Sequence, residues 1–399
     1  KLAASAEAYR VLEPERVGFV SYPYEWSFGQ LKDAAKATLQ IQGVALEHGM
    51  SLRDASAYNI QFHRGHPVLI DTLSFEKLRE GMPWVAYRQF CQHFLAPLAL
   101  MSRRDVRLGQ LLRAHLDGIP LDLATRLLPW GSRLRPSLLL HLALHARSQR
   151  RHASTAVEAS KRRRPFTLRA FRGLIDSLEG AVGRLSWAPE RTAWSDYYAE
   201  SESYSPRSMA HKRELVGAFL DEARPRTVWD LGGNVGLFSR LASSRGIATV
   251  TIDADPSPVE ANYRQVVADG DERLLPLWVD LTNPSPAIGW ENRERPSLLE
   301  RGPADLAMAL ALVHHLAIAN NVPLDRVASF LRRVAARWLV VEFVPKSDPK
   351  VRELLASRQD VFGGYSQEAF ELAFAERFEI RRREAIEGSA RTLYLMQAR

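Results

Sequence analysis

Cysteine is nearly absent from this chain of 399 residues, in which Cys91 is the only one. A single cysteine excludes an internal disulfide framework and suits a reducing cytosol. Because it lies in an apolar helical stretch, we interpret Cys91 as a small core residue. Long hydrophobic runs are also lacking: none approaches the roughly 20 residues that span a bilayer, and no secretory signal opens the sequence. We therefore expect a cytoplasmic protein with no membrane partner.

Acidic residues are outnumbered by basic ones, 46 against 54, which gives a net charge of +8. Such an excess permits RNA or another anionic partner but does not require one. Much of it lies in two clusters, at 147–152 and 161–164. No aromatic residues interleave these clusters, although base-stacking surfaces need them. We interpret residues 147–165 as a solvated basic linker, and nucleic-acid binding as the alternative.

Patterning divides the chain into three regions: 1–103, with short strand-like runs and helices; 104–203, which is predicted to be helical and contains the basic linker; and 204–399. In the last region apolar strand-like runs alternate with helical patterns, which is typical of a parallel α/β sheet. The strands are predicted at 226–231, 248–253, 275–279, 304–312 and 338–343, with a closing antiparallel pair at 378–383 and 392–396. The sequence therefore predicts an α/β protein with a Rossmann-like, seven-stranded C-terminal domain.

A glycine-rich turn follows the first of these strands directly and reads Asp230-Leu-Gly232-Gly233-Asn234-Val-Gly236. So tight a turn needs residues that tolerate positive φ, which glycine does without strain and asparagine does better than other residues. The dinucleotide fingerprint G-x-G-x-x-G fails here, because Asn234 and Leu237 occupy its second and third glycine positions. A strand–turn–helix unit without a ligand is the alternative.

Acidic residues end the next two strands. Asp253 ends the second strand, where a carboxylate can accept hydrogen bonds from both hydroxyls of a ribose. Asp280 ends the third strand and could accept a hydrogen bond from an adenine amino group. The spacing of these acids after the glycine turn therefore indicates a nucleoside-containing ligand.

The glycine turn resembles the D-x-G-x-G-x-G motif of class I S-adenosylmethionine-dependent methyltransferases, with Asn234 in place of the middle glycine. This resemblance covers the region 204–399. It implies that the stretch from Gly232 to Gly236 contacts the methionine and ribose parts of S-adenosylmethionine, and that Asp253 holds the ribose. It also implies that Asp280 and Leu281 contact the adenine. No metal site is predicted.

Candidate catalytic residues follow the fourth and fifth strands, since ligands of open α/β sheets bind at the carboxyl ends of strands. Methyl transfer is an in-line displacement, so the protein mainly positions and deprotonates the acceptor, a task that histidine suits. His314 and His315 follow the fourth strand, and alternation along a strand predicts that only one of them faces the acceptor. Of the two we favour His315. The alternatives are a purely structural histidine pair and Glu342, at the end of the fifth strand, as the base.

Two further features near the predicted site have a plain interpretation. The stretch Asn283-Pro-Ser-Pro286 is superficially similar to the N-P-P-Y motif of amino-methyltransferases, but it follows the third strand rather than the fourth, so we interpret it as a turn. Three aromatic residues are candidates for either pocket walls or core: Trp290, Tyr365 and Phe370.

Near the N-terminus, Asp54, Asn59 and Asp71 form a D-x-x-x-x-N motif followed by an apolar strand that ends in aspartate. This pattern resembles the catalytic loop of small-molecule kinases of the aminoglycoside phosphotransferase type, in which such residues orient the hydroxyl and hold magnesium. No glycine-rich loop or V-A-x-K strand precedes Asp54. We therefore interpret residues 1–103 as a degenerate kinase-like segment that transfers no phosphate; an active kinase and a chance match are the alternatives.

The stretches Ser21–Trp26 and Glu342–Lys346 resemble a group of bacterial methyltransferases related to nodulation host-specificity proteins. The sequence thus predicts an S-adenosylmethionine-dependent methyltransferase that acts on a small molecule or a carrier-bound biosynthetic intermediate. Alternatives are an RNA- or protein-directed methyltransferase and a kinase-like binding scaffold with an inactive methyltransferase fold. The substrate and the oligomeric state are not predicted.

Overall fold

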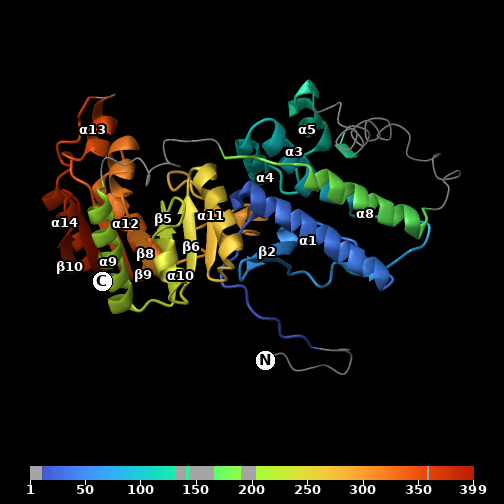
Figure 1. The fold of residues 1–399 in the computed structure, drawn as a ribbon, viewed down its shortest axis with the longest axis horizontal. Coiled ribbons are helices and arrows are strands. Elements are labelled where there is room, and N and C mark those ends of the chain that lie inside the picture. Colours follow the sequence, from blue (N-terminus) through green and yellow to red (C-terminus); the bar gives the residue numbers. More distant parts are fainter. Residues whose placement is uncertain (1–10, 132–140, 143–165, 190–203, 357–358) are drawn as a thin grey trace.

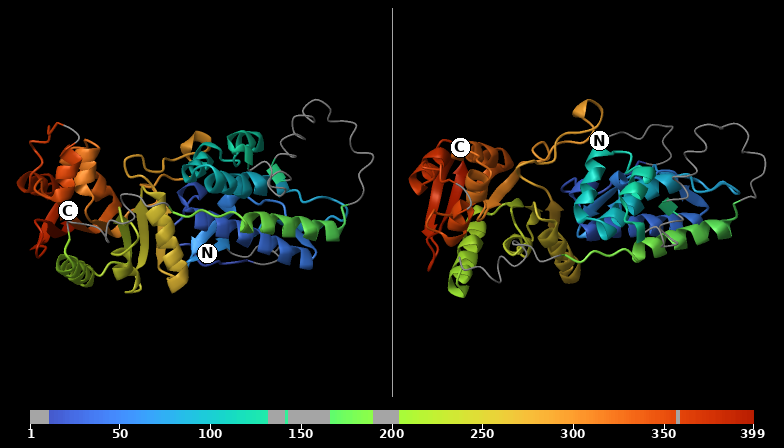
Figure 2. Two further views of the ribbon diagram at one scale, coloured as in Figure 1. Left: turned by 45° about the horizontal axis from the view of Figure 1, so that its top comes forward. Right: turned by 90° about the horizontal axis from the view of Figure 1, so that it is seen from above.

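The computed structural model describes residues 11–131, 141–142, 166–189, 204–356 and 359–399, so the predicted basic linker lies outside it. The chain forms two parts that lie side by side along the long axis of the molecule (Figures 1 and 2). One is a sheet domain built from residue 204 onward, and the other is an N-terminal lobe built from the described residues before 190. No described helix is long and apolar enough to cross a membrane.

The sheet domain contains a seven-stranded sheet in the order β10-β11-β9-β8-β5-β6-β7. Strands β9, β8, β5, β6 and β7 are parallel, and β11 runs antiparallel to its neighbours β9 and β10. This order is that of the class I methyltransferase fold, which confirms the predicted seven-stranded sheet. The strands are β5 (Thr227–Leu231), β6 (Ala248–Asp253), β7 (Leu274–Trp278), β8 (Ala304–Ala309), β9 (Ala335–Phe343), β10 (Phe378–Ala385) and β11 (Thr392–Ala398).

Alternating side chains of the central strands supply two separate cores, one on each face of the sheet. Val228 and Met308 lie in the core that α9 covers, whereas Leu231 and Ala309 lie in the core that contains residues of α12 and α14. Burial of each large apolar side chain stabilises the fold by about 1.5–3 kcal/mol. The helices are α9 (Pro206–Ala223), α10 (Ser239–Ser243), α11 (Pro256–Asp269), α12 (Leu324–Val334), α13 (Pro349–Ala356) and α14 (Gln367–Ala375).

The N-terminal lobe is mainly helical, with two small antiparallel strand pairs, β1–β4 and β2–β3. Its long first helix, α1, begins with a capping box, in which Ser27 and Gln30 satisfy each other's backbone N–H groups. Helix α8 packs along α1. The helices are α1 (Phe28–Glu47), α2 (Tyr87–Phe90), α3 (Ala96–Arg103), α4 (Leu111–Ala114), α5 (Leu121–Leu127) and α8 (Leu168–Gly183), with the π-helical turn η3 (Cys91–Leu95) and the 3₁₀ turns η1 (Pro23–Glu25), η2 (Ala57–Asn59) and η4 (Val106–Gln110). The strands are β1 (Met50–Leu52), β2 (Ile60–His63), β3 (His66–Leu69) and β4 (Phe75–Lys77).

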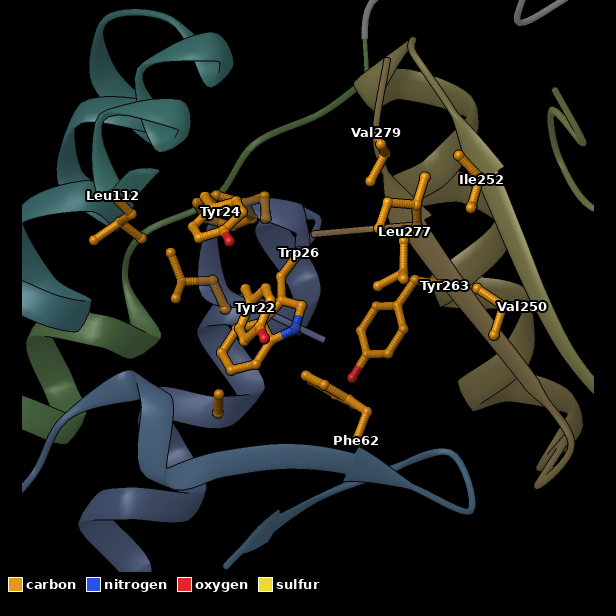
Figure 3. Packing of buried hydrophobic residues seen from close by; sticks show 14 of the residues in the cluster. Tyr22, Tyr24, Trp26, Phe62, Leu112, Val250, Ile252, Tyr263, Leu277 and Val279 are labelled. Carbon is orange, nitrogen blue, oxygen red and sulfur yellow. The ribbon is translucent and has the colours of Figure 1, made fainter. Parts of the chain in front are cut away.

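One apolar core continues from the N-terminal lobe into the sheet domain. In Figure 3 the side chains of Trp26 and Phe62 lie opposite Tyr263 and Leu277 of the sheet domain. The ring of Phe62 makes edge-on contacts with both Trp26 and Tyr263, with centroid distances of 5.3 and 5.8 Å. Such aromatic pairs add about 0.5–1.5 kcal/mol beyond their buried area. The lobe therefore covers the β7 edge of the sheet, and aromatic side chains of both parts contribute to the joint.

A buried ion pair reinforces this joint. The guanidinium of Arg301 binds both carboxylate oxygens of Glu25, and the two side chains are only 5% and 1% exposed. Ser285 donates a further hydrogen bond to Glu25, and Arg301 also lies over the Tyr22 ring at 4.6 Å from its centroid. The stretch Ser21–Trp26, singled out in the sequence, thus forms part of the contact between the two parts of the molecule.

We predict that Arg301→Met destabilises the protein by about 3–5 kcal/mol, because it leaves the carboxylate of Glu25 buried without its partner. Removing both charges in Glu25→Gln/Arg301→Met should recover part of that loss. The matched control, Arg107→Met, breaks an exposed pair with Asp105 and should cost less than about 1 kcal/mol. Urea unfolding measures all three variants, and equal losses for Arg301→Met and Arg107→Met would contradict this account of the joint.

Candidate functional site

The glycine turn after β5 has the positive-φ backbone that its sequence predicts. Gly232 and Gly236 have φ values of +74° and +78°, and Asn234 between them adopts +51°. The backbone N–H groups of Gly232 and Gly233 both donate to the carbonyl oxygen of Ile252, at 2.7 and 3.2 Å. These bonds tie the turn to β6 and hold its backbone at the carboxyl edge of the sheet.

Asp230, at the start of the turn, packs against it with a buried carboxylate. Its carboxylate is 1% exposed and accepts a hydrogen bond from Ser239, which in turn accepts one from Thr251 at 2.7 Å. Burial raises the pKa of Asp230 to about 6. A Cβ atom on Gly233 would lie 2.8 Å from a carboxylate oxygen of Asp230, so the glycine is needed for this packing. Asp230 and Gly233 therefore hold the turn in shape by packing and hydrogen bonding, and neither lines the cavity described below.

Asp253, at the end of β6, faces the turn. Its two oxygens accept backbone hydrogen bonds from Asn234 at 2.8 Å and from Asp255 at 2.9 Å. Each carboxylate oxygen has a second lone pair, which leaves capacity for two hydroxyl donors. Burial raises the pKa of Asp253 to about 6. The carboxylate is thus fixed in orientation and keeps acceptor capacity for a ligand.

A cavity of about 510 Å³ lies at the carboxyl ends of β5, β6, β7 and β8, where ligands of α/β sheets bind. Six of the residues predicted for the site line it: Gly232, Asn234, Asp253, Asp280, Leu281 and His315. Five others do not line it: Asp230, Gly233, Gly236, His314 and Glu342. The described residues contain no group of three or more His, Cys, Asp or Glu side chains placed to hold a metal ion.

The two histidines have different environments, although not for the predicted reason. Strand β8 ends at Ala309, and His314 has helical backbone angles immediately before the π-helical turn η9 (His315–Ala319), so strand alternation does not separate them. Their rings pack together with centroids 4.0 Å apart. His314 is fully buried, and neither of its ring nitrogens has a hydrogen-bond partner among the described residues. His315 lines the cavity, where π-helical turns are often functional.

Both imidazoles are neutral at physiological pH. Burial, followed by the positive charges of Arg391 and Lys350, lowers the pKa of His315 to about 4. Burial also lowers the pKa of His314 well below its ordinary value. A neutral His315 can accept a proton from a ligand, but it is a weaker base than a histidine of ordinary pKa.

Glu342 lies in a buried network instead of the cavity. Its oxygens accept hydrogen bonds from Tyr204, from Lys212 at 2.7 Å and from the backbone N–H of Ala311 at 2.9 Å, and Arg391 lies 3.5 Å away. Burial alone would raise the pKa of Glu342, but Lys212 and Arg391 hold it below its ordinary value. An ionised carboxylate with this many donors is a poor base.

Several cavity residues were not predicted from the sequence. Lys212 of α9 is the most informative of them, because its side chain is 1% exposed and yet lines the cavity. A signal was present: it stands with Ser208 and Val216 at four-residue spacing, on the buried face of α9. Leu354 of α13 and Asn320 after η9 also line the cavity.

The three candidate wall aromatics lie elsewhere. Tyr365 and Phe370 are core residues whose rings pack on Phe343, at centroid distances of 5.3 and 5.2 Å. Trp290 is 79% exposed, in the long segment between β7 and β8. None of them lines the cavity: Tyr365 and Phe370 have the core position that was the alternative to a pocket wall, and the exposed Trp290 has neither. The stretch Asn283–Pro286 lies in a loop that begins with a turn, in which Asn283 donates to the carbonyl of Asp280.

The residues of the predicted kinase-like motif lie near the two small strand pairs of the N-terminal lobe. Asp54 follows β1, and Asn59 and Asp71 flank the β2–β3 hairpin. Ser74 joins two of them, since it accepts a hydrogen bond from Asn59 at 3.2 Å and donates one to Asp71 at 2.7 Å. Asp54 accepts a hydrogen bond from the backbone of Ser56.

No family model matches the chain. Nodulation protein NoeA of Rhizobium meliloti (strain 1021) is 38% identical to it over 392 residues, which are 97% of this chain and 82% of the relative. The chain belongs to the NoeA family. The predicted resemblance to nodulation-related proteins is thereby confirmed. In this NoeA family member, the stretch Ser21–Trp26 lies in the joint between the two parts, and the stretch Glu342–Lys346 begins with the residue at the centre of the buried network.

Solved structures similar to part of this NoeA family member include three methyltransferases. Magnesium protoporphyrin IX methyltransferase from Synechocystis PCC 6803, with bound SAH, is 18% identical, with 48% of this chain and 84% of that chain covered and a TM-score of 0.34. The N-methyltransferase NodS from Bradyrhizobium japonicum WM9 is 12% identical over 49% and 98% of the two chains, with a TM-score of 0.37. The bifunctional kinase-methyltransferase WbdD is 17% identical over 54% and 44%, with a TM-score of 0.36.

We predict that Gly236→Ala destabilises this NoeA family member by about 1–3 kcal/mol more than Gly246→Ala. The two glycines have nearly equal φ values, +78° and +76°, so both substitutions incur the same backbone strain. A Cβ atom on Gly236 would lie 2.5 Å from the Asn262 side chain, whereas a Cβ on Gly246 meets nothing within 4 Å. Thermal unfolding compares the two; equal losses would show that the turn tolerates a side chain at Gly236.

Proposed function

We propose that the protein is an S-adenosylmethionine-dependent methyltransferase that acts on a small molecule or a carrier-bound intermediate. The observation that carries this proposal is the cavity at the carboxyl ends of β5 to β8, where the positive-φ glycine turn faces the oriented carboxylate of Asp253. The class I strand order supports it, because that order puts both features at one edge of the sheet.

The lining residues fit the parts of the cofactor in order along the sheet edge. Asp280 and Leu281, after β7, would contact the adenine, and Asp253, after β6, would accept hydrogen bonds from the ribose hydroxyls. Gly232 and Asn234 leave room for the sulfur-bearing chain beside the turn. When bound, the cofactor supplies an electrophilic methyl group on a positively charged sulfur.

His315 is the best placed residue to receive the acceptor's proton. It lines the cavity on the β8 side, beside the apolar side chains of Leu312 and Leu316. These apolar walls restrict water, which strengthens polar interactions inside the site. As a neutral imidazole, His315 would accept a hydrogen bond from the hydroxyl or amine that receives the methyl group. This bond would align the lone pair of that oxygen or nitrogen with the methyl group.

The cavity volume of about 510 Å³ lies within the range of small-molecule sites, which suits a ligand of the size of the cofactor. An RNA-directed activity would use the basic residues 147–165, which lie outside the described residues. For the N-terminal lobe we propose a degenerate kinase-like segment in a binding or scaffolding role. The hydrogen bonds of Asn59 and Asp71 to Ser74 support a structural use of these residues.

The direct test is binding of S-adenosylmethionine to the parent protein and to Asp253→Asn. We expect micromolar binding by the parent and about 10- to 100-fold weaker binding by the variant, because a charge-assisted hydrogen bond is lost. Asp221→Asn, which alters an exposed carboxylate paired with Arg245, is the matched control and should bind like the parent. Calorimetry measures all three; absence of binding by the parent, or parental affinity in Asp253→Asn, would refute the proposed site.

Binding should also depend on pH. Because the pKa of Asp253 is about 6, its carboxylate is neutral below that value and ionised above it. Ribose hydroxyls donate more strongly to the ionised form, so affinity should rise as the pH is raised from 5 to 7 and level off above 7. In Asp253→Asn this rise should shrink, and any remaining rise reports the titration of Asp230, whose pKa is also about 6. A pH-independent affinity in the parent would contradict the ribose contact.

Substitution of the two histidines separates catalysis from packing. His315→Ala should lower turnover by about 10²-fold with cofactor affinity nearly unchanged, because the group that accepts the proton is lost. His314→Ala should mainly lower the melting temperature, since it opens a cavity in a fully buried position. Turnover is measured with S-adenosylmethionine and the acceptor once it is identified. If both variants keep parental turnover, His315 is not the base.

A further inference from the structure

The buried ammonium group of Lys212 has more hydrogen-bonding capacity than the protein uses. It donates to the Tyr204 hydroxyl at 3.0 Å and to a Glu342 oxygen at 2.7 Å. An ammonium group carries three donors, and no acceptor among the described residues receives the third. An unused donor on a charged group that is 1% exposed is costly unless a ligand completes it.

The position of Lys212 is fixed, and it lies at a definite end of the cavity. Its ammonium lies over the rings of Phe238 and Tyr204, 4.6 and 4.8 Å from their centroids. Phe238 follows the glycine turn, and the oxygen of Glu342 that binds Lys212 also holds Ala311, at the end of β8. In the strand order β9-β8-β5-β6-β7 these contacts lie on the side away from β7, opposite the acids expected to hold the ribose and adenine.

We propose that Lys212 binds the carboxylate of the amino-acid part of S-adenosylmethionine; the inference rests on the proposed function. The amino-acid part extends from the sulfur away from the ribose, which directs it from the β5 turn towards Lys212. Its carboxylate would accept the third hydrogen of the ammonium in a charge-assisted bond. The α-ammonium of the same group balances the added negative charge, so the charges of the buried network stay compensated.

Glu342 then has the role of a positioning residue. By binding Lys212 and the backbone of Ala311 with the same oxygen, it sets the lysine against the cavity wall. Arg391 is held by a bidentate pair with Asp348, at 2.7 and 3.0 Å, and does not line the cavity. Lys212 is therefore the cation of this network that reaches the cavity.

The test compares S-adenosylmethionine with decarboxylated S-adenosylmethionine, which lacks only this carboxylate, by calorimetry. The parent should bind S-adenosylmethionine about 10- to 100-fold more tightly than the decarboxylated form. In Lys212→Met the affinity for S-adenosylmethionine should fall by about that factor, and the affinity for the decarboxylated form should change less than about twofold. The matched control, Lys36→Met, removes a half-exposed lysine of α1 and should keep the parental preference.

Because Lys212→Met removes the closer of the two cations beside Glu342, the double variant Lys212→Met/Glu342→Gln is measured beside it and should show the same loss of preference. If Lys212→Met or the double variant keeps the parental preference for the carboxylate, or loses affinity equally for both ligands, the inference is overturned while the proposed function stands. If the parent binds neither ligand, the proposed function itself fails.

Discussion

The pairing of the buried Glu342 carboxylate with its hydrogen-bond donors is the interaction on which the rest of the site depends. A carboxylate removed from water must be paired, and Glu342 accepts hydrogen bonds from four residues in three parts of the chain: Tyr204, Lys212, Ala311 and Arg391. These contacts bring α9, the end of β8 and the segment before β11 to one point on β9. Ala311 has a positive φ of +51°, a conformation that its hydrogen bond to Glu342 helps to hold. The buried carboxylate of Glu342 therefore holds Lys212 and Ala311 in place in the cavity wall on this side.

The opposite side of the cavity is linked to the N-terminal lobe by the segment between β7 and β8. The segment between β7 and β8 begins with Asp280 and Leu281 in the cavity and continues to Ser285 and Arg301, which bind Glu25 of the lobe. The lobe thus buries the β7 edge of the sheet and fixes the segment that would contact the adenine. An unpaired strand edge invites association with other chains, so this packing also protects the sheet.

Local patterns in the sequence were enough to predict the sheet domain. An apolar run of strand length, and a turn that needs glycine at positive φ such as the one with Gly232 and Gly236, can each be recognised from a few consecutive residues. The role of Lys212 was not predictable in this way, because its partner Glu342 lies 130 residues away. The reason given for separating His314 from His315 was wrong, since β8 ends early and the pair has helical backbone. The aromatic residues Tyr365 and Phe370 could not be assigned from sequence, because core and pocket walls select the same side chains.

The most direct test of the central claim, that the cavity at the carboxyl edge of the sheet holds S-adenosylmethionine, is a crystal structure of the protein with S-adenosylhomocysteine. Density for adenine beside Leu281, for ribose hydroxyls at Asp253 and for the amino-acid carboxylate beside Lys212 is the predicted result. Density for the ligand elsewhere in the molecule, or an empty cavity at saturating ligand, would contradict it.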